Sequence, residues 1–217
     1  MTDCRDAAGD AAPAAAGLEA IALLHEVDHR MKNNLQLIAS LILLQSRRAA
    51  DPAARVALKG ALERVAAISA VHRGLSPSDP TVFQVAEFMR DLTRDLAGAV
   101  GRDDLQIALE LDEVTIPASS AAPFALVFNE LLGNALKHGF PAGRPGLTTI
   151  SLANRGEAYV LTVADDGVGM GDASPGFGSM IVGLLSQQLH ADLQISDAKP
   201  GVRATVTIPV SRAAVAS

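Results

Sequence analysis

The stretch NELLGNALKH, residues 129–138, is the most informative part of this sequence for both fold and chemistry. Its apolar residues follow helical spacing, and we predict a helix from about Ser119 to His138. Glu130, Asn134 and Lys137 are separated by four and three positions, so all three share one face of that helix. An amide oxygen can ligate a metal ion, a cation can neutralise phosphate charge, and a carboxylate can orient a water or the metal. These groups suit a site for Mg²⁺ and a triphosphate, although a solvated polar face of an amphipathic helix would also carry them.

Two glycine-containing motifs follow in the second half of the chain. DDGVGM, residues 165–170, comes directly after an expected strand, Tyr159–Val163. The Asp165 carboxylate at the strand end can accept a hydrogen bond from an exocyclic amine such as that of adenine, and the glycines let the backbone approach a flat base. GFGSMIV, residues 176–182, leads into an expected helix near Met180–Leu189, whose N–H groups and dipole favour phosphates. Each motif alone is weak, because Asp-Gly pairs are common in turns and glycines commonly precede helices.

The N-terminal part of the chain predicts a helical hairpin. From Leu18 to about Ala50 there is no proline or glycine, and apolar residues follow helical spacing in two stripes. Asp51 is expected as the N-cap and Pro52 as the first residue of a second helix, which ends near Gly74. A hairpin cannot bury both stripes by itself, so we predict that two copies form a dimeric four-helix bundle. The stripes are Ile21, Leu24, Met31, Leu35, Ile38 and Ile42, and Leu37, Leu41 and Leu44.

The motif HRMKNN, residues 29–34, lies in the middle of the first predicted helix. Asn33 is one turn after His29 and within hydrogen-bonding reach of its imidazole. A carboxylate on one ring nitrogen would fix the tautomer and leave the other nitrogen free as a nucleophile. Lys32 could shield an incoming phosphoryl group. The carboxylates near the imidazole are Glu26, one turn before it, and Asp28, its neighbour. The alternative is a solvated polar band on a bundle helix.

The same region matches the H-E-x-x-H pattern of zinc proteases, from His25 to His29. A catalytic zinc site needs a third protein ligand. No further histidine or glutamate follows at the required spacing, and the next acidic residue after Asp28 is Asp51. We therefore interpret this match as accidental.

The chain beyond Pro80 predicts an α+β sandwich, with helices on one face of a mixed sheet. A helix is expected from Val82 to Ala99, and alternation predicts a strand over Leu105–Leu111. The remaining expected strands are Thr149–Leu152, Tyr159–Val163, Leu193–Ser196 and Ala204–Ile208. The predicted organisation is a disordered leader (residues 1–17), a helical hairpin (18–78) and an α+β domain (79–217).

Composition excludes several classes of function. The chain has 217 residues, a formal net charge of −6 and 3% aromatic residues, so it lacks the basic surface and the stacking platforms of a nucleic-acid-binding protein. It has no polybasic membrane patch and no secretory signal, and we expect no membrane association. The single cysteine, Cys4, excludes an internal disulfide, which fits a reducing compartment such as the cytoplasm.

The order and spacing of the motifs resemble those of histidine kinases with the GHKL-type ATPase fold. Residues 129–138 resemble the N box, residues 165–170 the first glycine box and residues 176–182 the second, and residues 201–209 resemble the closing strand. HRMKNN followed by Leu35 is similar to the phosphoacceptor box of the second HisKA class, which is related to the HWE kinases. The resemblance covers nearly all of the chain from Leu18 to Val210. It implies that residues 18–78 are a dimerisation and histidine phosphotransfer hairpin and that residues 79–217 are a catalytic ATP-binding domain.

This resemblance implies ATP-dependent autophosphorylation of His29, and transfer of the phosphoryl group to an aspartate on a response regulator. It implies that Asp165 recognises adenine, that Asn134 ligates Mg²⁺, and that Glu130 and Lys137 line the phosphate side. The expected catalytic residues are His29, Glu26, Asp28, Lys32, Asn33 and Glu130. The expected nucleotide-binding residues are Asn129, Glu130, Asn134, Lys137, His138, Asp165, Gly167, Gly169, Met170, Gly176 and Gly178. The expected partners are a response-regulator receiver domain, a second copy of the chain and a separate sensor protein.

The sequence departs from the family pattern in two places. The Trp-x-Glu of the HWE group is absent because the chain has no tryptophan, which favours the sister class. Only Gly171–Pro175 separate the glycine boxes, so the lid over ATP is expected to be short. Two alternatives remain: a histidine phosphotransferase adaptor in a phosphorelay with a vestigial ATP domain, and a stand-alone serine kinase or anti-sigma factor that resembles the C-terminal half alone.

Overall fold

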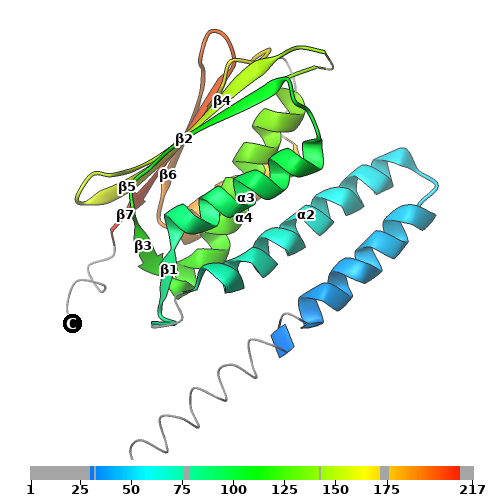
Figure 1. The fold of residues 1–217 in the computed structure, drawn as a ribbon, viewed down its shortest axis with the longest axis horizontal. Helices are drawn as coiled ribbons and strands as arrows, with labels where there is room; N and C mark the ends of the chain where they lie inside the picture. The colour runs from blue at the N-terminus through cyan, green and yellow to red at the C-terminus, as the bar shows by residue number, and fades with distance from the viewer. Residues whose placement is uncertain (1–29, 32, 76–78, 142, 172–175, 211–217) are drawn as a thin grey trace, which may run out of the picture. The chain divides into compact units, whose positions relative to one another are not determined.

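The computed structural model describes residues 30–31, 33–75, 79–141, 143–171 and 176–210 (Figure 1). The chain divides after Val65 into two compact units. This division falls inside helix α2, Pro52–Gly74. The domain boundary expected near residues 76–80 therefore stays a prediction, and the expected leader, residues 1–17, lies outside the described residues.

The first unit contains a helical hairpin, as the sequence predicts. Residues 30–31 and 33–48 are helical, and α2 begins at Pro52. The Asp51 Oδ1 atom accepts a hydrogen bond of 2.9 Å from the Ala53 N–H, which confirms the expected cap. The rest of the predicted first helix lies outside the described residues.

One of the two apolar stripes of the first helix remains exposed. Leu37 and Leu41 are 64% and 63% exposed, and Leu44 is exposed as well. Leu35 and Ile42, on the other stripe, are half-buried. Met31 and Ile38, also on that other stripe, are 41% and 45% exposed. Within the described residues the hairpin thus covers one stripe only in part and leaves the leucine-rich face open, as we expect of a hairpin that needs a further partner.

The second unit is built on a five-stranded mixed sheet with the strand order β2-β4-β5-β7-β6. The pair β2 and β4 is parallel, and the other three pairs are antiparallel. The strands are β2 (Leu105–Leu111), β4 (Gly146–Asn154), β5 (Ala158–Asp165), β6 (Asp192–Asp197) and β7 (Val202–Pro209). Each predicted strand is therefore confirmed, with bounds one to three residues wider where they differ.

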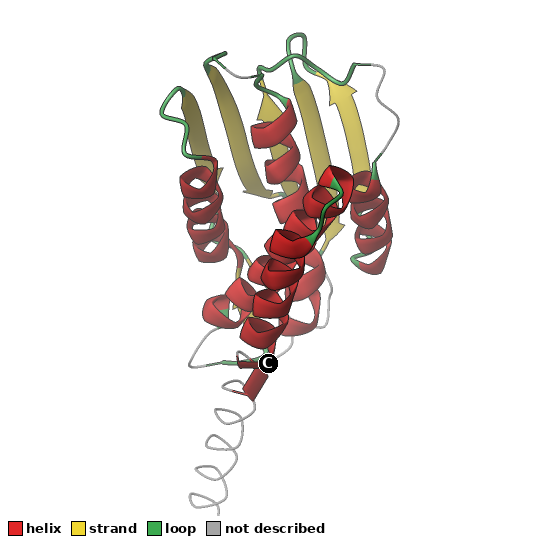
Figure 2. Cartoon of the chain, turned by 90° about the vertical axis from the view of Figure 1, so that its right-hand side faces the viewer, coloured by secondary structure: helices red, strands yellow, loops and turns green. Residues whose placement is uncertain are grey.

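The helices of this unit lie on one face of the sheet (Figure 2). They are α3 (Val85–Val100), α4 (Ala118–His138) and α5 (Phe177–Gln188). The sandwich with helices on one face of a mixed sheet is thus confirmed. None of the helices among the described residues is both long and apolar enough to cross a membrane.

The expected helix from Val82 to Ala99 is wrong at its start. Residues Val82–Gln84 form a short strand, β1, that pairs antiparallel with β3, Thr115–Pro117. Val82 and Phe83 have side chains that favour strands, and Gln84 has extended backbone angles of φ −83° and ψ 98° before α3 begins. The sequence does not predict strand β3, because three residues ending in proline are too few to show a period.

The core lies between the inner face of the sheet and the helices. Ile150 and Leu152 of β4 face it beside Leu161 and Val163 of β5, and all four are buried. A row of four phenylalanines extends the core through β1, α3 and α4. Neighbouring ring centroids in the row Phe83, Phe88, Phe124 and Phe128 are 5.1, 6.5 and 6.5 Å apart.

Phe128→Ala should strongly destabilise the second unit, because Phe128 is fully buried and its ring stacks on Phe124. We expect the free energy of unfolding to fall by about 3–5 kcal/mol, measured by urea denaturation. The control is Leu109→Ala on β2, where the side chain is 39% exposed and the loss should be much smaller. Equal losses for the two variants would contradict this description of the core.

Candidate functional site

The Asp165 carboxylate is the central group of the candidate site. Asp165 is the last residue of β5 and follows Leu161 and Val163 on the inner face of the sheet. Its Oδ1 atom accepts a 3.0 Å hydrogen bond from the Gly167 N–H and a 3.3 Å hydrogen bond from the Val202 N–H. Asp165 thus places a buried, oriented carboxylate on the inner face of β5, where the two preceding inward-facing residues are aliphatic.

Burial raises the pKa of Asp165 above its usual value of 3.8, and the two backbone N–H groups oppose this shift. The ionised form therefore carries a desolvation cost that these bonds offset in part. Such a carboxylate is a strong acceptor for a donor that enters the site.

Three glycines from distant parts of the chain surround this carboxylate. A methyl group on Gly139 would lie 3.1 Å from Asp165 Oδ1, and one on Gly167 would lie 2.7 Å from it. A methyl group on Gly201 would lie 2.8 Å from the same atom, and Gly201 also has a φ of +91°. No side chain fits at these three positions, so backbone atoms alone surround the carboxylate there. We call Gly139, Gly167 and Gly201 the cradle of Asp165.

The cradle includes residues that sequence reasoning missed. Gly167 belongs to the predicted site, whereas Gly139 and Gly201 do not. Gly139 directly follows His138 at the end of α4, and Gly201 is the last residue before β7. Their position beside predicted motifs indicates that they lie near the site, but it does not predict that both lie against the Asp165 carboxylate.

Thr148 is a second residue that sequence reasoning missed. It is the cross-strand partner of Asp165 and is fully buried. Among the described residues its hydroxyl has no hydrogen-bond partner. A buried polar atom of this kind beside Asp165 marks this end of the sheet as more polar than the rest of the core.

The first glycine box connects this cradle to the end of α4. The Val168 N–H donates a 2.9 Å hydrogen bond to the Gly139 carbonyl, and Gly169 has a φ of +82°. Met170 is 54% exposed, so it is available to a ligand at the edge of the site. Residues 172–175, which hold most of the expected short lid, lie outside the described residues.

The predicted N-box residues divide between the interior and the surface of α4. Asn134, Lys137 and His138 are exposed, which places an amide and two nitrogen-bearing side chains at the surface. Asn129 and Glu130 are buried instead, at 4% and 9% exposure. The structure therefore places Asn134, Lys137 and His138 together at the surface, whereas Asn129 and Glu130 are buried.

The second glycine box packs directly against the N box. A methyl group on Gly178 would lie 2.6 Å from Glu130 Oε2 and 4.0 Å from Asn134 Oδ1. Gly176 precedes α5, and no side chain caps the first turn of this helix. The missing side chain of Gly178 lets the start of α5 approach both polar residues of α4.

The residues predicted around the nucleophile are mostly not covered by the structure. His29, Glu26, Asp28 and Lys32 lie outside the described residues. Asn33 is described, and it is an exposed residue of the first helix. The assignment of His29 and its neighbours therefore stays a prediction.

Comparisons with protein families match both parts of the chain. A HisKA_2 model, described as histidine kinase, matches residues 26–100. A second model, described as histidine kinase-, DNA gyrase B-, and HSP90-like ATPase, matches residues 120–212. The second match contains the cradle residues from Gly139 to Gly201 and the N box.

Named relatives agree with these families. The chain is 32% identical over 206 residues to the sensor histidine kinase PdtaS of Mycobacterium tuberculosis, a match that covers 88% of this chain and 40% of the relative. It is 28% identical over 200 residues to blue-light-activated histidine kinase 2 of Erythrobacter litoralis, a match that covers 87% of this chain and 57% of the relative. The chain thus spans about half the length of these relatives.

A solved structure agrees with the fold as well. The histidine kinase domain of the Erythrobacter litoralis EL346 blue-light activated histidine kinase matches with a TM-score of 0.66 and 26% identity. The match covers 90% of this chain and 97% of that domain. From its two family matches, its relatives and its fold, the chain belongs to the histidine kinases that join a HisKA_2 region to a GHKL-type ATPase domain.

Proposed function

We propose that this chain is an ATP-dependent protein histidine kinase that phosphorylates its own His29 and passes the phosphoryl group to an aspartate of a response regulator. The observation that carries the proposal is the glycine-lined Asp165 carboxylate beside the exposed end of α4. Asp165 supplies the acceptor for a base amine, and α4 supplies the groups for a metal and phosphates. This reaction uses ATP as donor, which favours the cytoplasm as its location.

Recognition of adenine would rest on Asp165. The exocyclic amine of adenine would donate to the Asp165 carboxylate, whose orientation is fixed by the Gly167 and Val202 N–H groups. Gly139, Gly167 and Gly201 leave this carboxylate free of side chains that would block a flat base. Gly169 and Met170 would border the base at the outer edge of the site.

The phosphates would lie along the exposed end of α4. The Asn134 amide oxygen can ligate Mg²⁺, and the Lys137 ammonium can neutralise phosphate charge. The close approach of Gly178 to Glu130 and Asn134 supports a shared site for α4 and the second glycine box. Gly176, Gly178 and His138 would contact phosphate oxygens, and Glu130 would orient the metal or its water.

Phosphoryl transfer requires that His29 reach the terminal phosphate of ATP. A neutral ring nitrogen of His29 would attack the γ-phosphorus, forming a P–N bond while the bond to the leaving ADP oxygen breaks. The other ring nitrogen would keep its proton, held by Glu26 or Asp28, with Asn33 and Lys32 near the incoming group. Catalysis would come mainly from positioning and charge neutralisation.

We further propose that the hairpin forms a homodimer through its exposed leucine face. Leu37, Leu41 and Leu44 are adjacent on one stripe and exposed in the single chain. Burial of such a face between two copies would give the four-helix bundle that both apolar stripes require.

His29→Ala should abolish labelling by γ-labelled ATP and Mg²⁺, because the variant lacks the nucleophile. The label on the wild type should be acid-labile, measured by autoradiography before and after acid treatment. His25→Ala, one turn earlier in the sequence, is the matched control and should label like the wild type. Label that persists in His29→Ala would contradict the assignment. A wild type that takes no label but accepts phosphate from a phosphorylated regulator would support the adaptor alternative.

Asp165→Asn should reduce ADP affinity by about tenfold or more, because an amide group would face the base amine with a second donor.

The same Asp165→Asn variant should be more stable than the wild type at neutral pH. The Asp165 pKa is raised on folding, so the ionised carboxylate costs stability above that pKa, and the cost vanishes as the pH falls below 3.8. The side-chain oxygen of the substituted amide can still accept the two backbone hydrogen bonds.

These two effects of Asp165→Asn are measured by calorimetric titration with ADP and by thermal unfolding across pH. The control is Asp112→Asn, an exposed carboxylate at the other end of the sheet that accepts a 2.8 Å bond from the Asn154 N–H. It should leave ADP affinity unchanged. Unchanged ADP binding by Asp165→Asn would contradict its role in base recognition.

Leu41→Lys should convert the proposed dimer to a monomer, because it places a charge in the centre of the leucine face. Light scattering after size-exclusion chromatography should show the mass of two chains for the wild type and of one for the variant. Leu184→Lys, at a 65% exposed leucine of α5, is the control and should remain dimeric. A monomeric wild type would contradict the proposed bundle.

A further inference from the structure

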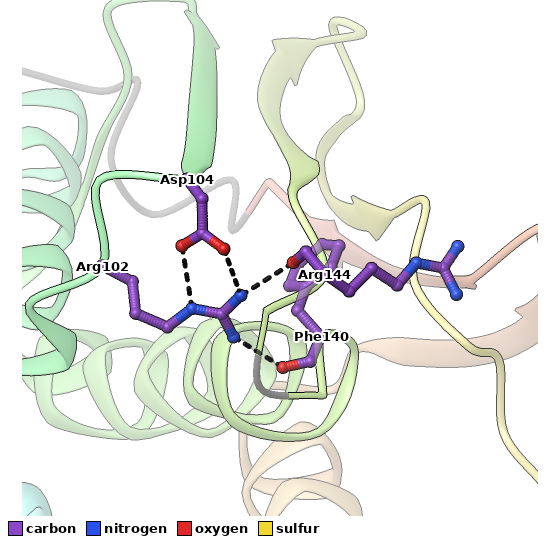
Figure 3. Close-up of polar contacts among 4 residues, drawn as sticks. All are labelled: Arg102, Asp104, Phe140 and Arg144. Carbon is purple, nitrogen blue, oxygen red and sulfur yellow. Dashed lines mark hydrogen bonds and ion pairs between the residues drawn. The ribbon is translucent and has the colours of Figure 1, made fainter.

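Arg102 forms a side-chain network with Asp104, Phe140 and Arg144 in the second unit (Figure 3). It lies between α3 and β2, and its side chain is only 22% exposed. Its Nε and Nη2 atoms donate hydrogen bonds of 2.9 and 2.7 Å to the two carboxylate oxygens of Asp104. Its Nη1 and Nη2 atoms donate bonds of 2.7 Å each to the carbonyls of Phe140 and Arg144.

This network holds the segment between α4 and β4. Phe140 and Arg144 both belong to that segment, and the Gly146 N–H at its end donates to the Asp104 carbonyl at 3.2 Å. The Phe140 side chain is 3% exposed, so the segment is also fixed by packing. The pairing raises the pKa of Arg102 and lowers that of Asp104, so both groups stay ionised at neutral pH.

The held segment touches the Asp165 cradle at two places. Gly139, at its start, adjoins the carboxylate, and its carbonyl accepts the 2.9 Å bond from the Val168 N–H. Arg144, near its end, donates from Nη2 to the Asp166 carbonyl at 2.9 Å. The Asp166 Oδ1 atom also accepts a 2.8 Å hydrogen bond from the Leu147 N–H, which holds Asp166 at a second point. Arg102 is therefore connected to both sides of Asp165 through the backbone that it binds.

We propose that Arg102 is a positioning residue for nucleotide recognition, which fixes the segment after α4 so that Gly139 and Asp166 keep the Asp165 carboxylate in its base-binding orientation. This inference rests on the proposed function, because it concerns the same site. Arg102 touches no ligand in this role. Its effect is on how well the site distinguishes a base with an exocyclic amine from one without it.

The chemistry of this position requires arginine rather than any cation. The planar guanidinium offers donors in a fixed fork, which here pairs with both oxygens of Asp104 and still reaches two carbonyls. A lysine ammonium has three donors around one atom and cannot make the same four bonds in that plane. Arg102→Lys therefore keeps the charge but removes the geometry.

The test compares ADP with inosine diphosphate, which lacks the exocyclic amine that Asp165 would accept. Dissociation constants for both are measured by calorimetric titration of the full chain, together with thermal unfolding. The wild type should prefer ADP by about tenfold or more, because inosine diphosphate leaves the buried carboxylate without its donor. Arg102→Lys should reduce this preference at least threefold. Arg144→Ala, which removes the bond to Asp166 and a positive charge that acts on Asp165, should reduce it in the same direction.

The matched control is Arg90→Ala. Arg90 forms a 2.8 Å ion pair with Glu113, and both side chains are exposed. Neither residue belongs to the network around Asp165. This variant should retain the full preference for ADP. A loss of preference in Arg90→Ala equal to that in Arg102→Lys would show a general effect of losing an arginine and would overturn the inference.

Other outcomes are equally decisive. If Arg102→Lys unfolds at a lower temperature but keeps the ADP preference, Arg102 is only structural and the inference is wrong. If that variant does not fold, Arg144→Ala decides, and an unchanged preference overturns the inference. A wild type that binds neither nucleotide overturns the proposed function itself, and a wild type that binds both equally overturns base recognition by Asp165.

Discussion

The buried carboxylate of Asp165 is the constraint on which the second unit depends. An ionised group at the end of an inner strand is costly unless donors surround it, and here the donors are backbone N–H groups of Gly167 and Val202. Those groups can come close only because glycines occupy the neighbouring positions. The turn after β5, the turn before β7 and the end of α4 must therefore all meet at one point, which fixes three connections of the sandwich at once.

Much of this arrangement is predictable from the sequence, because it rests on local patterns. The helical spacing of residues 129–138 predicts α4 with nearly correct bounds, alternation predicts β2, and the other four strands of the main sheet are expected as well. Asp51 and Pro52 predict the start of α2. Asp165 is expected at the site only through the order and spacing of the three motifs, because an Asp-Gly pair after a strand is by itself an ordinary turn signal.

The parts that sequence reasoning misses depend on contacts between distant segments. Nothing local to Gly139 or Gly201 indicates that each lies against Asp165, and nothing in the sequence near Thr148 indicates a buried hydroxyl. Arg102 resembles an ordinary charge at a helix end, and its role follows only from the carbonyls that the fold brings to it. The same holds for β1 and β3, which are too short to be recognised without each other. Burial of Asn129 also does not follow from the spacing that places Asn134 at the surface.

The unsatisfied polarity at this end of the sheet has a consequence for how the domain behaves when it is empty. Asp165 and Thr148 are cross-strand partners in the interior. Burial raises the pKa of Asp165, and the Thr148 hydroxyl has no hydrogen-bond partner among the described residues. A ligand that binds these polar groups only in the native state would shift the equilibrium toward the folded protein by mass action. If the proposed nucleotide binds here, the stability of the folded domain would rise with the concentration of that nucleotide.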